Sequence, residues 1–408
     1  MKQITLLFLL IIQSTIAQNT LFNQVEAKNI GPTIMSGRVV DLAVNPKNPT
    51  EFYVAYATGG LWYTNNNGTS FTPLMDSAET VNCGSVTVDW SSGTIWVGTG
   101  EVNSSRSSYA GIGVYKSSNG GKSWDYLGLP ETQHIGRIVI NPSNTNIVWV
   151  AAIGHLYSPN KERGVYKTED GGKTWKQTLF IDDLTGAIDL VVDPINPQTL
   201  YTATWHRERT AWNFVEGGET SGIYKSTDGG STWSLLSTPT SGFPIGKGVG
   251  RVGLAIYPKN PKIIYAILDN QFPREAIKKD TKSSDYEIET FAKITKAEFA
   301  ALDDRKLTNF LRSNRFPAKY TAKGVKEKVA IDEIKPSALA EFIDDPYTSV
   351  FAPPPVEAEV YRSNDAGLTW KKANTMDLKG LYNTYGYYFG QITVSPENED
   401  KVYIMGVP

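Results

Sequence analysis

Short apolar segments recur along the chain, and each is followed by a turn that is rich in proline and asparagine. In the first copy Val39 to Val44 precedes Asn45-Pro46, and a second apolar segment runs from Phe52 to Tyr56. Later copies surround Asn141-Pro142, Asp193-Pro194, Tyr257-Pro258 and Ser395-Pro396. Proline fixes φ and asparagine tolerates left-handed backbone, so both residues favour turns. The pattern predicts pairs of short antiparallel strands.

A second motif, S/T-x-D/N-x-G-x-x-W/F, follows the strand pairs. Its five copies carry Asn66, Asn119, Asp170, Asp228 and Asp365 at the third position, and they end at Phe71, Trp124, Trp175, Trp233 and Trp370. The Asp or Asn can accept backbone N–H bonds inside a turn, the glycine supplies positive φ, and the aromatic ring packs between strands. A third strand leads into each motif and a fourth follows it. The sequence therefore predicts an all-β fold, a β-propeller of four-stranded blades.

These motifs resemble the Asp boxes, or BNR repeats, of exported bacterial propeller proteins. They are similar to those of sialidases, of xyloglucanase-like glycoside hydrolases and of sortilin (VPS10) domains. The resemblance extends from about residue 30 to residue 408. It implies the propeller fold, but the fold hosts both enzymes and binding proteins. No Asp box follows the last apolar strands, so we expect the chain to stop in a sixth repeat.

Composition divides the chain into four parts: a signal peptide over 1–17, blades one to four with the start of blade five over 28–271, an insertion over 272–358, and the remainder over 359–408. Lys2, the apolar run Ile4 to Ile12 and the small residues before Gln18 are typical of a signal peptide. The sequence thus predicts secretion, or a periplasmic or cell-surface location. The insertion in the fifth repeat holds 15 Lys/Arg and 15 Asp/Glu, and Thr295 with Glu298 forms a capping box. We expect this insertion to be α-helical.

Charge and residue counts exclude several classes of function. The formal net charge of −2 argues against nucleic-acid binding. Cys83 is the single cysteine, so no intrachain disulfide can form. We predict no cofactor, no metal site and no transmembrane segment. A metal site built from His155, His206 and a glutamate remains an alternative, because spacing alone does not decide it.

Variable loops between the second and third strands of each blade are the expected site of function. They run about 98–113, 153–164 and 204–222, and the insertion is the fifth-blade equivalent. Three arginines follow a glycine at the start of a first strand and are expected near the central channel. The candidate ligand-binding residues are Arg38, Arg137, Arg251, Glu101, Arg106, Tyr109, His155, Trp205, His206, Arg207 and Trp212. An arginine cluster with aromatic residues suits a carboxylate-bearing or sugar ligand. Alternatively, the arginines brace the blades by bonding backbone carbonyls.

A glycoside hydrolase would need two carboxylates. Glu101 and Asp269 are the catalytic candidates, and Glu208 and Glu216 lie in the same region. The resemblance to xyloglucanases implies a catalytic Asp before Gly59-Gly60, but Ala57 occupies that position. The sialidase Arg-Ile-Pro motif is also missing, although Tyr109 lies near Glu101.

We therefore expect an exported propeller that binds a carbohydrate, or an extracellular peptide or protein, through its variable loops. A glycoside hydrolase acting on the same face is the alternative, and a structural cell-surface or adhesion module is the second alternative. The sequence does not predict the oligomeric state.

Overall fold

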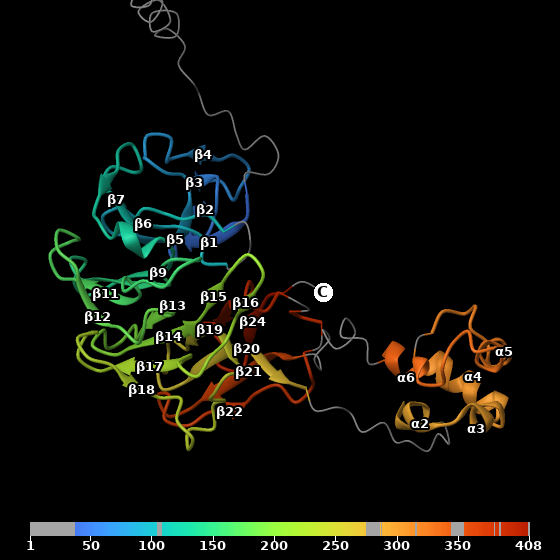
Figure 1. The fold of residues 1–408 in the computed structure, drawn as a ribbon. Helices are drawn as coiled ribbons and strands as arrows, with labels where there is room; N and C mark the ends of the chain where they lie inside the picture. The colour runs from blue at the N-terminus through green and yellow to red at the C-terminus, as the bar shows by residue number, and fades with distance from the viewer. Residues whose placement is uncertain are drawn as a thin grey trace, which may run out of the picture. The chain divides into compact units, whose positions relative to one another are not determined.

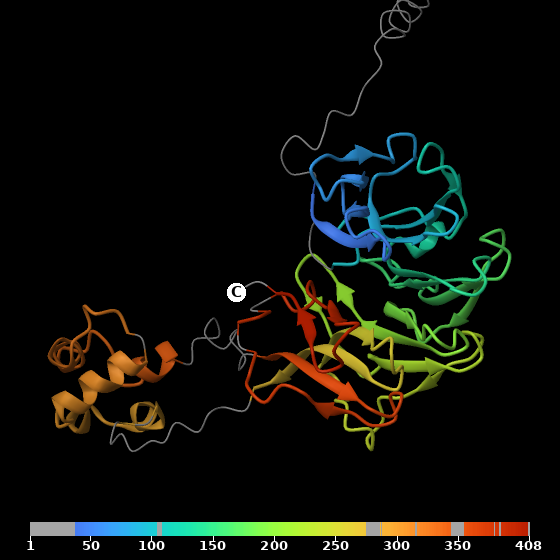
Figure 2. The same ribbon diagram turned by 180° about the vertical axis from the view of Figure 1, so that it is seen from behind.

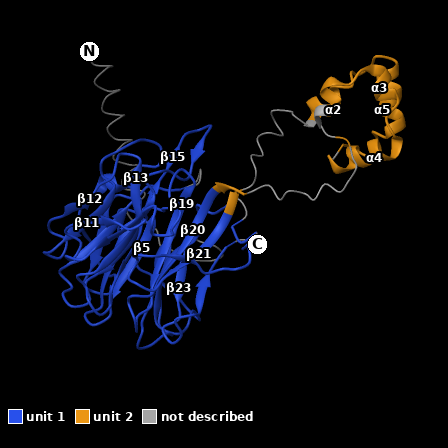
Figure 3. Ribbon diagram, turned by 90° about the horizontal axis from the view of Figure 1, so that it is seen from below, with its two compact units in different colours: residues 1–271, 357–408 blue, residues 272–356 orange. Residues whose placement is uncertain are grey.

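The computed structural model describes residues 37–103, 108–274, 286, 288–314, 316–343, 355–378, 380–382 and 385–406. The predicted signal peptide and Arg106 lie outside the described residues. The chain divides into two compact units, one of residues 1–271 with 357–408 and one of residues 272–356 (Figure 3). We call them the propeller unit and the helical unit.

Five four-stranded antiparallel sheets make up most of the propeller unit (Figures 1 and 2). The first three contain β1 (Val39–Val44), β2 (Phe52–Tyr56), β3 (Gly60–Thr64) and β4 (Thr72–Pro73); β5 (Cys83–Asp89), β6 (Thr94–Thr99), β7 (Val114–Ser117) and β8 (Asp125–Tyr126); and β9 (Ile135–Ile140), β10 (Val148–Ala152), β11 (Gly164–Thr168) and β12 (Lys176–Leu179). The next two contain β13 (Thr185–Val192), β14 (Leu200–His206), β17 (Gly222–Ser226) and β18 (Ser234–Leu235); and β19 (Val249–Ile256), β20 (Ile264–Pro273), β21 (Pro355–Ser363) and β22 (Lys371–Lys372). The predicted fold class, an all-β arrangement of four-stranded blades, is confirmed.

Smaller elements complete the propeller unit: the two-stranded sheet β23 (Ile392–Val394) and β24 (Val402–Ile404), the hairpin β15 (Glu208–Arg209) and β16 (Phe214–Val215), and the 3-10 helix η1 (Pro130–Thr132). The first strands of successive sheets contact one another in the order β1, β5, β9, β13, β19 and β23. Residues of β1, β9, β13, β19 and β23 line a groove of about 860 Å³. The blades are therefore arranged side by side around their first strands.

The core lies between neighbouring blades. Trp96 and Val114 of the second blade pack with Ile138, Val148 and Val150 of the third. Because a blade is covered on both faces by its neighbours, its middle strands are apolar on both sides. All five residues of β10 are buried for this reason.

The Asp boxes form closed turns between the third and fourth strands. In the fourth blade Ser226 Oγ donates to Asp228 Oδ1 over 2.8 Å, and the same Oδ1 accepts from the backbone N–H of Thr232 over 2.9 Å. Ser226 Oγ also accepts from Gly230 N over 2.8 Å. The pattern repeats at Asn66, Asn119, Asp170 and Asp365. These hydrogen bonds, which close each turn, therefore lie within the box itself, and its aromatic side chain takes no part in them.

Three box tryptophans tie their blade to the preceding one. Trp124 Nε1 donates to Leu74 O over 2.6 Å, and Trp175 Nε1 donates to Leu127 O over 2.8 Å. Trp233 Nε1 reaches Thr178 Oγ1 over 3.2 Å. Trp370 instead donates to Gly367 O within its own box, and Phe71, which has no such donor, packs edge-on against Phe52.

The helical unit contains α2 (Ile288–Lys293), α3 (Lys296–Ala300), α4 (Asp304–Ser313), α5 (Ala322–Ala330) and α6 (Ala338–Ile343). The Thr295–Glu298 capping box is present at the start of α3, so the helical prediction is confirmed at this point. Phe291, Phe299 and Phe310 are buried in a core that the unit builds from its own helices.

Candidate functional site

Strand direction alternates within each blade, so the chain places two kinds of connection at opposite ends. The Asp boxes and the Pro/Asn turns lie at one end, which we call the Asp-box face. The connections from second to third strands and the starts of the first strands lie at the other, which we call the loop face. The helical unit is inserted between β20 and β21, so its connections belong to the loop face.

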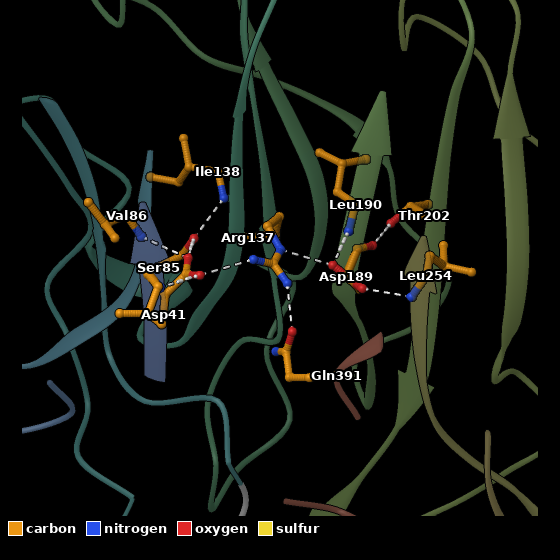
Figure 4. A network of polar contacts seen from close by, with 11 residues as sticks. Asp41, Ser85, Val86, Arg137, Ile138, Asp189, Leu190, Thr202, Leu254 and Gln391 are labelled. Carbon is orange, nitrogen blue, oxygen red and sulfur yellow. Dashed lines mark hydrogen bonds and ion pairs between the residues drawn. The ribbon is translucent and has the colours of Figure 1, made fainter. Parts of the chain in front are cut away.

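Arg137 does not lie free at the rim of the channel, because three blades share its guanidinium (Figure 4). Its Nε donates to Asp189 Oδ1 over 3.0 Å, its Nη1 to Asp41 Oδ1 over 3.2 Å, and its Nη2 to Gln391 Oε1 over 3.1 Å. Burial by itself would lower the pKa of Arg137, but the carboxylates of Asp189 and Asp41 outweigh burial and raise it. Arg137 thus links the first, third and fourth blades with β23.

The two carboxylates also hold the backbone of the next blade. Asp41 Oδ2 accepts from Val86 N over 3.0 Å, and Asp189 Oδ2 accepts from Leu254 N over 2.8 Å. Together with Arg137 and Gln391 these residues form what we call the channel collar. Asp41, Asp189 and Gln391 were not among the residues expected from the sequence, although each directly precedes apolar residues that lead into a Pro turn.

Arg38 is engaged by Glu101, the first catalytic candidate. Arg38 Nε donates to Glu101 Oε1 over 2.7 Å, and Arg38 Nη2 contacts Glu101 Oε2. The hydrogen bond that Arg38 donates to Glu101 is the main cause that raises the pKa of Arg38. Glu101 is fully buried, so its carboxylate serves this pair and does not face solvent.

Arg251 is buried, and its Nη1 donates to Asn103 Oδ1 over 2.7 Å and to the backbone oxygens of Tyr387 and Tyr388. The three guanidiniums therefore have different partners: Glu101 for Arg38, the channel collar for Arg137, and Asn103 with two backbone oxygens for Arg251. The reason is register: the next turn proline follows Arg38 by 8 residues, Arg137 by 5 and Arg251 by 7. A shift in strand pairing between Val249 and Val252 absorbs the extra residues of the fifth blade.

Asp269, the second catalytic candidate, is enclosed in the same region. Its Oδ1 accepts from Gln271 Nε2 over 2.8 Å, while Oδ2 has no hydrogen-bond partner among the described residues. Burial raises the pKa of Asp269 to about 7. Burial raises the pKa of Glu216 to about 8, with a further contribution from Asp269. Buried carboxyls with raised pKa values favour the protonated form, but neither Glu101 nor Asp269 is open to a polysaccharide chain in this structure.

The aromatic candidates separate into buried and exposed residues. Trp205 is 0% exposed and its Nε1 donates to Glu216 O over 2.9 Å, so its indole packs inside the protein in this structure. Arg207 is also buried, beneath the loop surface. Trp212 is 87% exposed and Tyr109 is 48% exposed, and both belong to connections of the loop face.

Both candidate histidines pair with nearby acids. His155 Nε2 lies 3.1 Å from Glu131 Oε2, and His206 Nε2 lies 3.2 Å from Glu208 Oε1. They do not share a site with Glu101, and the described part of the chain holds no group of three His, Cys, Asp or Glu that could bind a metal. Among the same residues no helix is long and apolar enough to cross a membrane.

Trp212 is carried by the β15–β16 hairpin. Thr210 and Asn213 close its turn through a backbone hydrogen bond of 2.9 Å and a side-chain bond of 3.0 Å. Phe214 packs edge-on against Tyr387 at 5.1 Å between ring centroids, and Arg209 lies over Phe214. The exposed indole is therefore held on a braced support.

Comparison with known proteins adds a family and a fold. The family model Sortilin-Vps10, described as "Sortilin, neurotensin receptor 3", matches residues 113–321, just over half of the chain. No curated protein matches the sequence.

Among solved structures, the GH74 enzyme of Niastella koreensis is similar with 19% identity and a TM-score of 0.51 over 90% of this chain. The GH74 xyloglucanase of Xanthomonas campestris has 12% identity and a TM-score of 0.47 over 90% of this chain. The chain covers only 44% of each of these two proteins. YCF48 from Cyanidioschyzon merolae has 13% identity and a TM-score of 0.37, with 92% of this chain and 94% of that chain covered. At these identities the likeness to the Niastella koreensis enzyme shows the propeller fold alone.

Proposed function

Because the chain belongs to the Sortilin-Vps10 family, we propose that it is a ligand-binding propeller whose loop face takes an extracellular polysaccharide or peptide. The family description names a receptor, which supports binding over hydrolysis. The ligand class itself is our proposal.

The exposure of Trp212 on its braced hairpin carries this proposal. A large exposed indole is costly to keep in water, and tryptophan is enriched among the residues that dominate binding energy. Sugar rings and peptide side chains both stack on such a surface. Tyr109 and Tyr157 are also exposed on loop-face connections and extend the aromatic surface available there.

The internal pairing of the polar candidates argues in the same direction. Arg38 and Arg137 are engaged by the protein's own carboxylates, and Arg251 is engaged by backbone oxygens. Glu101 and Asp269 are buried. The loop surface is thus better equipped to hold a ligand by aromatic contact than to cleave it between two carboxylates.

The test is a binding panel of immobilised polysaccharides and peptides, measured with the wild-type protein, Trp212→Ala and Leu368→Ala. Leu368 is 63% exposed on the Asp-box face, so it is a matched control for the loss of an exposed apolar side chain. We expect Trp212→Ala to weaken binding by about 30-fold, equivalent to about 2 kcal/mol for a dominant contact. Leu368→Ala should bind as the wild type does.

Equal binding by wild type and Trp212→Ala would overturn the proposal. Oligosaccharides incubated with the protein should be recovered intact by mass spectrometry, and cleavage products would favour the glycoside hydrolase instead.

Export is part of the proposal because of the sequence of residues 1–17. N-terminal sequencing of secreted protein should begin at Gln18, and a retained Met1 would refute export by this signal.

A further inference from the structure

A small cavity of about 80 Å³ lies between two loop-face connections, at residues 156–159 and 207–210. Two arginine side chains, Arg163 and Arg207, are part of its wall. Tyr157 stands at the same cavity and is exposed to solvent. Arg163 was not expected from the sequence to be buried, because nothing in its local pattern distinguishes it from a surface arginine.

Arg163 is used mainly as a structural clamp. Its Nη1 donates to Ile153 O over 2.7 Å, and its Nη2 donates to His155 O over 2.8 Å and Ser158 O over 3.0 Å. Carbonyl oxygens satisfy the N–H groups but bring no negative charge. Burial lowers the pKa of Arg163 to about 10, although the carboxylates of Asp182 and Asp183 act in the opposite direction.

The guanidinium of Arg207 makes fewer hydrogen bonds than that of Arg163. Arg207 is 1% exposed, its Nη1 donates to Val102 O over 3.3 Å, and its guanidinium lies 5.4 Å from the ring of Trp205. Its Nε and Nη2 have no hydrogen-bond partner among the described residues. Burial lowers its pKa well below the ordinary value, and the cations Arg163 and Arg251 lower it further.

The two unpartnered atoms of Arg207 share one edge of the guanidinium. The N–H bonds of that edge run parallel, which is the arrangement that binds a carboxylate or phosphate with two hydrogen bonds. A buried cation without an anion is costly. Glu208 also borders the cavity, but its Oε1 is held by His206.

The cavity has room for an anion. A water molecule occupies about 30 Å³ of liquid volume, so a space of this size exceeds one water. Water would satisfy the free N–H groups without balancing the charge, whereas an oxyanion would do both. A carboxylate or a phosphate group is small enough to enter.

We propose that this cavity, the Arg207 cavity, binds a small oxyanion, a carboxylate or phosphate group, on the Nε–Nη2 edge of Arg207. Tyr157 borders this cavity and also belongs to the aromatic surface of the loop face. Anion binding in the cavity does not depend on whether Trp212 binds a polysaccharide or peptide. Its occupant supplies the counter-charge that Arg207 lacks, since only burial and two cations act on the pKa of Arg207.

The first test measures the melting temperature of the full chain against sodium acetate and sodium phosphate, at ionic strength held constant with sodium chloride. Anion binding to the folded state should raise the melting temperature in a dose-dependent way. Arg207→Met should abolish this response, and it should raise the melting temperature in the absence of added anion, because an uncompensated buried charge is replaced by an apolar side chain. Arg305→Met, at an exposed position of α4, should keep the wild-type response.

Two results would overturn the proposal: a wild-type protein that does not respond to either anion, or an Arg207→Met variant that keeps the response. Should Arg207→Met fail to fold, Arg207→Lys keeps the charge but loses the two-bond edge. We expect it to need about tenfold more anion for half of the full response. An unchanged midpoint in Arg207→Lys would equally refute the proposal.

A second measurement locates the anion and its source. Crystals soaked in sodium selenate should show an anomalous peak beside Arg207 Nε and Nη2, and an empty cavity would contradict the assignment. Oligogalacturonate is then compared with acetate in the melting assay. A midpoint at least about tenfold lower for oligogalacturonate indicates a carboxylate carried by a larger ligand, and equal midpoints indicate a free anion. Both results require the Arg207 cavity to be an anion site.

Discussion

Replacement of Arg137 by methionine measures how much the channel collar contributes to the free energy of unfolding. The substitution removes the cation shared by Asp41 and Asp189 and leaves both carboxylates without it. Their side chains are 12% and 7% exposed, and that of Arg137 is 23% exposed. Removing one partner of a buried ion pair costs about 3–5 kcal/mol. Because water reaches part of this site, we expect Arg137→Met to lower the free energy of unfolding by about 2–4 kcal/mol.

The loss should be visible as a lower melting temperature. At about 2.1 cal/mol/K per residue, the roughly 320 residues of the propeller unit have an unfolding entropy near 0.7 kcal/mol/K. The melting temperature should therefore fall by about 3–6 °C in calorimetry at pH 7. Arg305→Met is the control for loss of an exposed arginine and should leave it unchanged.

A second substitution separates charge from packing. Asp41→Asn added to Arg137→Met removes one of the two unpaired carboxylates, so the double variant should be more stable than Arg137→Met alone. A melting temperature of Arg137→Met within about 1 °C of wild type would refute this reasoning, since the collar would then contribute almost nothing. A double variant less stable than the single one would show that Asp41 acts through Ser85 and Val86 and not through the arginine.

Two further predictions concern the buried carboxyls and the helical unit. The folded-state pKa values of Asp269 and Glu216 are raised to about 7 and about 8, so the native state keeps protons that the unfolded chain loses above about pH 4. The free energy of unfolding that the two carboxyls contribute therefore declines as pH rises from about 4 to about 8. Glu216→Gln and Asp269→Asn should flatten that decline in urea titrations, and unchanged slopes would contradict the assignment. Replacing residues 275–354 with a short Gly/Ser linker should leave a folded propeller unit, since β20 and β21 are neighbours in one sheet. Insoluble protein or loss of cooperative melting would show that the insertion is needed for folding.

The blades could be predicted from the sequence because each repeat is nearly self-contained. The Asp box closes its own turn through bonds between residues two to four apart, as Ser226, Asp228 and Thr232 show. Local pattern is then sufficient to place the strands. The capping box of Thr295 and Glu298 is equally local, and it also appears as predicted.

The candidate site could be predicted only in part, because its chemistry depends on partners that are far apart in the chain. Trp205 and Trp212 are close in sequence and have the same side chain, yet Trp205, in β14, is fully buried and Trp212, in the β15–β16 hairpin, is almost fully exposed. The hairpin β15–β16 makes this difference, and its short strands lack a clear periodic pattern. Likewise, the Gly-Arg dipeptides look equivalent, but strand register sends their side chains to Glu101, to the collar and to Asn103.

Carbene footprinting of the protein with and without its strongest panel ligand is the decisive test of ligand binding at the loop face. Bound ligand should protect the connection of residues 207–222, with Trp212 as the most protected residue. The Asp-box turn of residues 226–233 should be labelled equally in both states. Protection of that turn, with Trp212 labelled alike in the two states, would contradict the account.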